Sequence, residues 1–60
     1  MILIHTVEVG GLYEPLSTVW TGLSYEDAEA EAKRWKTEES ASVAKVVVWD
    51  DHRRSFEWEV

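Results

Sequence analysis

Four short stretches of the chain are rich in β-branched and aromatic residues, and apolar and polar positions tend to alternate within them. This pattern predicts four β-strands. Gly10, Gly11 and Pro15 interrupt regular structure between the first two, and Asp50-Asp51-His52 is typical of a polar hairpin turn between the last two. The predicted strands cover residues 2–9, 16–21, 43–50 and 53–60.

The segment LSYEDAEAEAKRWKTEE, residues 23–39, has the pattern of an amphipathic helix. Ser24 is a good N-cap residue, and acidic side chains follow it in the first turn, where the helix dipole favours negative charge. At helical spacing, one apolar stripe runs along the segment. The stripe consists of Tyr25, Ala28, Ala32 and Trp35.

The order β-β-α-β-β predicts a single α+β domain over residues 1–60. The economical arrangement is a four-stranded, mainly antiparallel sheet with the one helix packed on one face, because both elements must bury an apolar side. Within it, we expect Trp35 at the interface between helix and sheet and Trp58 on the inner face of the sheet.

The balance of charge limits the classes of partner. The chain carries 12 acidic and 6 basic residues, a net charge of −6, and no lysine or arginine precedes residue 32. A nucleic-acid-binding protein normally presents a basic face, so direct binding of nucleic acid or of an anionic membrane is disfavoured. The longest apolar run, Val46 to Trp49, is too short to span a bilayer. We therefore expect a cytoplasmic protein, and the lack of cysteine fits a reducing compartment.

Residues that could support catalysis are few. His5 and His52 have no partner at metal-ligand spacing, the chain has no cysteine, and no nucleophile elbow or phosphate-binding loop occurs. The sequence predicts no catalytic residue, no cofactor and no metal site, and hence a protein that is not an enzyme.

Apolar residues on both faces of the predicted sheet point to binding of a protein instead. One narrow helix can cover only one face, so part of this apolar surface should remain open, with Trp49 as an anchor for a partner. The alternative is that Trp49 completes a tight core. Ile2 is a further candidate for the open side. The predicted protein-binding residues are Ile4, Trp20, Val47, Trp49 and Arg53.

The segment TGLSYEDAEAEAKRW, followed by a valine-rich strand, resembles short uncharacterised proteins encoded by bacteriophages, particularly those of actinobacteria. In these, a T-G-L-[ST]-x-E-[DE]-A motif leads from a strand into a helix, and the resemblance covers residues 18–50. It implies a phage product in the host cytoplasm that acts on host proteins, and it assigns no catalytic or binding residue.

Two functions are therefore expected, in order. The first is a small non-enzymatic protein that binds a host protein or its own copy, as a homodimer, through an apolar sheet face or an edge strand. The alternative is an acidic nucleic-acid mimic that inhibits a DNA-binding host or defence protein. Its helix would supply the acidic side chains of Glu26, Asp27, Glu29 and Glu31.

Overall fold

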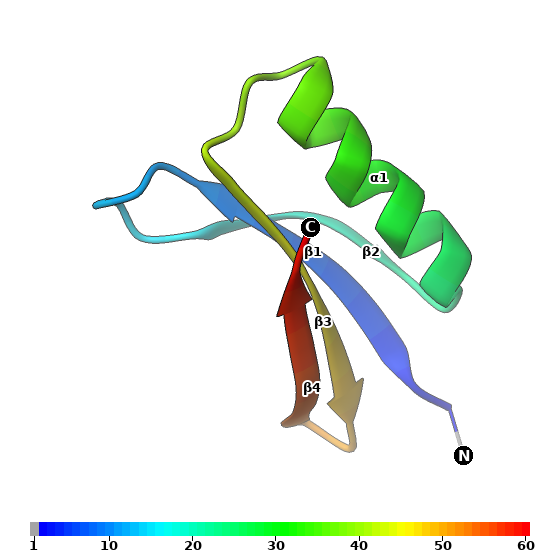
Figure 1. Ribbon diagram of the computed structural model, residues 1–60. Coiled ribbons are helices and arrows are strands. Elements are labelled where there is room, and N and C mark those ends of the chain that lie inside the picture. The colour runs from blue at the N-terminus through cyan, green and yellow to red at the C-terminus, as the bar shows by residue number, and fades with distance from the viewer. Residues whose placement is uncertain (1) are drawn as a thin grey trace.

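The computed structural model describes residues 2–60 and confirms the predicted α+β fold, with four strands and one helix in the order β-β-α-β-β (Figure 1). The third strand has the predicted bounds, and the other elements differ from the prediction by two residues at most at either end. The elements are β1 (Ile4–Gly10), β2 (Ser17–Gly22), α1 (Tyr25–Thr37), β3 (Val43–Asp50) and β4 (Arg53–Glu59).

The four strands form one open antiparallel sheet in the order β2-β1-β3-β4. The two hairpins lie side by side and join through the central pair, in which Val7 of β1 opposes Val46 of β3. β2 and β4 are the two edges of the sheet. The last residues of the described chain therefore lie along a free edge.

α1 packs on one face of the sheet through its small residues. Ala28 and Ala32 are fully buried against a core that includes Val7, Ala44 and Val46. Two alanines in the middle of the helix allow its backbone to approach the sheet closely. Figure 1 shows the helix lying on one side of the strands.

Local sequence sets both ends of α1. The backbone of Ser24 is extended, and its hydroxyl oxygen accepts a hydrogen bond from the amide of Asp27 at 3.3 Å, which satisfies one of the free donors of the first turn. At the other end Ser40 adopts the left-handed region (φ 57°), and the amide of Ala41 donates to the carbonyl of Trp35 at 3.0 Å. The chain thereby reverses into β3.

The turn between β3 and β4 confirms the predicted polar hairpin turn at Asp50-Asp51-His52. Asp50 pairs with Arg53, so the loop itself has two residues, Asp51 and His52, both at positive φ (50° and 71°). Two successive residues at positive φ are typical of a type I′ turn, which matches the twist of the flanking strands. Neither residue is glycine, so the turn holds backbone strain.

We expect His52→Gly to raise the free energy of unfolding by about 1 kcal/mol, because glycine occupies the left-handed region without the steric cost that a Cβ brings. Urea unfolding of the two proteins measures the difference. The matched control is Arg53→Gly, next in the chain but inside β4, where glycine should destabilise. Equal effects of the two substitutions would contradict the strained turn.

Candidate protein-binding surface

α1 does not cover the whole sheet. Its backbone lies over β1 and β3 and, to a lesser extent, over β2, but it does not approach the backbone of β4. The helix-side residues of β4 are therefore reached by side chains of α1 but not covered by its backbone. These residues are Phe56, Trp58 and the following Val60, which stand in register with Val48, Val46 and Ala44 of β3.

A row of aromatic rings joins this uncovered strand to the start of the helix. The ring of Tyr25 stacks on Trp58 with centroids 4.8 Å apart, and the ring of Phe56 lies 5.1 Å from that of Trp58 at a tilt. His5 meets Tyr25 edge to face at 6.3 Å. Phe56 is 60% exposed and Tyr25 is 44% exposed. We call Tyr25, Phe56 and Trp58 the aromatic row.

A groove of about 430 Å³ continues this surface between α1 and β4. Its floor is apolar and its rim on the helix is charged. Lys33 pairs with Glu29 at 3.6 Å, and the Lys36 ammonium donates to the carbonyl of Ser42 at 3.4 Å. The lining residues are Glu29, Lys33, Lys36, Thr37, Trp58 and Val60.

Tyr25 connects the aromatic row to the charged rim. Its hydroxyl donates a hydrogen bond to a carboxylate oxygen of Glu29 at 3.1 Å. Desolvation and the neighbouring Glu29 carboxylate both raise the pKa of Tyr25, so the phenol stays protonated around neutral pH and remains a donor.

The opposite face of the sheet carries no helix, yet its own side chains close it. The indole Nε1 of Trp49 donates to the hydroxyl oxygen of Thr6 at 2.9 Å, and the guanidinium of Arg54 lies 5.2 Å from the centre of the Trp49 ring. Beneath these groups Thr6, Glu8 and Val47 are buried, and Val47 is fully so.

Arg54 is held on this face by two carboxylates, an arrangement that we call the Arg54 network. Its guanidinium donates to both carboxylate oxygens of Glu8, at 3.0 and 3.1 Å, and to Glu57 at 2.7 Å. Lys45 adds a contact to Glu57 at 3.6 Å. Hydrogen bonds to Glu8 and then to Glu57 raise the pKa of Arg54, and the hydrogen bond from Arg54, with the nearby Lys45, lowers the pKa of Glu57.

The five predicted binding residues do not form one surface. Ile4 is 43% exposed, Trp49 is half-buried with its polar atom bonded to Thr6, and Arg53 is exposed beside the turn. Val47 lies on the expected face but is fully buried, so it cannot touch a partner directly. Trp20 is not on the open face, because it packs against the helix-side core with its ring over Gly22.

Trp35 and Trp58 lie where the sequence predicts them, since both pack against the core on the helix side. Sequence reasoning missed that α1 reaches Trp58 only through side chains, and that Phe56 and Tyr25 extend the same surface. The alternation of Phe56, Glu57, Trp58 and Glu59 was the available signal. This alternation does not indicate that β4 is an edge strand of the sheet.

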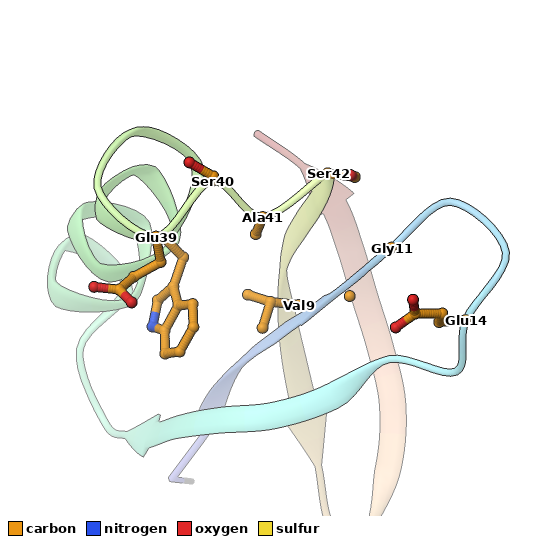
Figure 2. A pocket seen from close by; sticks show the side chains of 9 residues that line it. Val9, Gly11, Glu14, Glu39, Ser40, Ala41 and Ser42 are labelled. Carbon is orange, nitrogen blue, oxygen red and sulfur yellow. The ribbon is translucent and has the colours of Figure 1, made fainter.

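A second, smaller hollow of about 260 Å³ lies between the C-terminal end of α1 and the β1–β2 loop (Figure 2). Val9 and Ala41 lie at its base, and the carboxylate of Glu14 approaches from the β1–β2 loop. The buried indole Nε1 of Trp35, another lining residue, has no hydrogen-bond partner among residues 2–60. The mixture of serine, glycine and acidic side chains around it defines no particular ligand.

Comparison with protein-family models, with curated proteins and with solved structures finds no match. Over the described residues, the structure contains no helix long and apolar enough to cross a membrane. Residues 2–60 also bring together no cluster of histidine, aspartate and glutamate side chains that could hold a metal ion.

Proposed function

We propose that this chain is a small non-enzymatic protein that binds a protein partner through β4, using the aromatic row and the groove beside it. The observation that carries the proposal is the partly uncovered helix-side face of β4, where Phe56 is 60% exposed and its ring contacts that of Trp58 at a tilt. Exposed aromatic residues next to a groove are typical of binding hot spots.

The Arg54 network argues against the opposite face as the main contact. An apolar side chain of a partner would have to displace a guanidinium that holds two carboxylates and lies over Trp49. The proposed contact is therefore on the helix side of β4, and not on the face of the sheet without a helix, where the sequence predicts it. A bacterial host protein is the partner that the resemblance to bacteriophage proteins suggests.

The acidic mimic is the less well supported alternative. Such a mimic needs acidic side chains at regular spacing over a broad surface, but Glu29 pairs with Lys33 and Glu31 pairs with Arg34. Binding by a mimic would weaken steeply with salt, whereas contact through the aromatic row should persist.

Site-specific photo-crosslinking tests the proposed function. A photoreactive amino acid at position 56 should crosslink to one discrete protein in a lysate of the source cells. Excess wild-type protein should compete, and the folded variant Trp58→Ser should not. Tyr13, 98% exposed in the β1–β2 loop, is the matched control position. The same crosslinks from positions 13 and 56, or competition by Trp58→Ser, would refute the proposal.

A further inference from the structure

β4 presents two chemically different faces along a free edge. On the helix side it carries Phe56, Trp58 and the following Val60. On the other side it carries Arg54, Glu57 and Glu59, of which Arg54 and Glu57 are bonded to each other. Because β4 is the last strand in the order β2-β1-β3-β4, another strand can be added beside it.

The hydrogen bonds to β3 show which backbone groups of β4 are free. The amide of Val60 donates to the carbonyl of Ala44 at 2.9 Å, so this residue directs its amide toward β3. In an antiparallel ladder the direction alternates along the strand. The amides and carbonyls of Glu57 and Glu59 therefore point away from β3, to the open edge.

The charges on this edge determine which strand fits. A second copy that paired antiparallel through the free backbone groups of Glu57 and Glu59 would place these acids opposite one another, since residues of one face meet residues of that face. Arg54 on the same face is already bonded to Glu8 and Glu57, so it offers no free base to a second copy in another register. Each copy also carries a net charge of −6. A strand with basic side chains on this face and apolar side chains on the other would complement both faces of β4.

We propose that β4 pairs with an extended segment of a partner protein in which basic and apolar side chains alternate. Its apolar side chains extend the aromatic row, and its backbone bonds to the free edge. Its basic side chains lie nearest to Glu59, which forms no ion pair among residues 2–60, because Glu57 already pairs with Arg54 and Lys45. This inference rests on the proposed function, because it names the kind of segment that the β4 surface binds.

A blocked synthetic peptide that alternates lysine with valine is the probe. Added to isotope-labelled protein, it should shift the NMR signals of the β4 amides and slow hydrogen exchange at Glu57 and Glu59. A peptide with glutamate in place of lysine, and a peptide of the same composition with its lysines grouped, should each bind at least about fivefold more weakly. Equal binding of all three peptides would overturn the inference.

Two substitutions at one position separate backbone pairing from charge. Glu59→Pro removes a backbone donor at the edge that β3 does not use, so the lysine peptide should no longer slow hydrogen exchange at Glu57. In Glu59→Gln the peptide should still slow it. Glu59→Lys should weaken the lysine peptide about fivefold and strengthen the glutamate peptide. Circular dichroism verifies that each variant is folded. Unchanged binding by both Glu59→Pro and Glu59→Lys would refute pairing at this edge.

The outcomes distinguish this inference from the proposed function. Suppose that position 56 crosslinks to a partner, that Trp58→Ser does not compete, and that the protein shows no preference for the lysine peptide. The proposed protein-binding surface would then stand, but its pairing with a basic strand would be refuted. Sedimentation that shows dimers of wild-type protein but not of Glu59→Pro would assign the edge to a second copy and would also refute it.

Discussion

Replacing Val47 by alanine should lower the free energy of unfolding by about 2 kcal/mol, which is close to the effect of Val46→Ala on the other face. Both side chains are fully buried, although only Val46 faces the helix. The substitution removes two methyl groups beneath the Arg54 network and leaves a cavity. Urea unfolding of the two variants measures the difference.

This result would separate a closed face from an open docking surface. If the face without a helix were open to solvent, Val47→Ala would cost much less than Val46→Ala. Val43→Ala is the control on the same strand, since Val43 is only half-buried at its start and should show a smaller effect. A cost for Val47→Ala no greater than that of the control would contradict the closed face.

Arg54→Ala should lower the melting temperature by several degrees, whereas Arg53→Ala should change it little. Arg54 is the partner of Glu8, a carboxylate that is only 8% exposed, and removing the guanidinium leaves this buried charge unpaired. Arg53 is the matched control, because it is the preceding arginine and is exposed at the turn. Thermal unfolding followed by circular dichroism makes the comparison.

A second substitution tests whether the buried charge is the cause. The double variant Arg54→Met with Glu8→Met should be more stable than Arg54→Ala, because it removes the carboxylate together with its partner. If the double variant is no more stable than Arg54→Ala, lost packing over Trp49 and Val47 explains the effect, and the unpaired carboxylate does not.

Arg54→Ala should also change how the free energy of unfolding depends on pH in the acid range. Arg54 lowers the pKa of Glu57 in the folded state below its ordinary value of 4.5, which applies in the unfolded chain. The stability from this pair is therefore fully present above about pH 4.5 and is lost as the pH falls through the lowered folded value. Unfolding measured between neutral and acidic pH should show a shallower loss in Arg54→Ala than in the wild type.

The sequence contains enough information to predict the elements and the fold class. Ser24 marks the start of α1, and the two alanines of its stripe are the residues that pack against the sheet. The polar run at Asp50-Asp51-His52 gives the last turn. These features depend on residues close together in the chain, so pattern and capping rules are sufficient.

The binding surface depends on contacts between distant parts of the chain, which the patterns do not contain. Arg54 and Glu8 are 46 positions apart, and they meet only because β1 pairs with β3 and β3 pairs with β4. Without that pairing, Val47 reads as an open apolar residue and Trp58 as a covered one. In retrospect, the continuous run of Val46, Val47 and Val48 is the signal for a central strand, because such strands are buried on both faces.

The pairing of β1 with β3 has a consequence for how the chain acquires its structure. The middle of the sheet forms only when the early residues meet residues nearly forty positions later, so closing this long loop must precede most of the stabilising contacts. While the chain folds, the first hairpin can form from neighbouring residues before β3 joins it. Until β3 pairs with β1, the inner edge of that hairpin has unpaired backbone groups that another chain can bond.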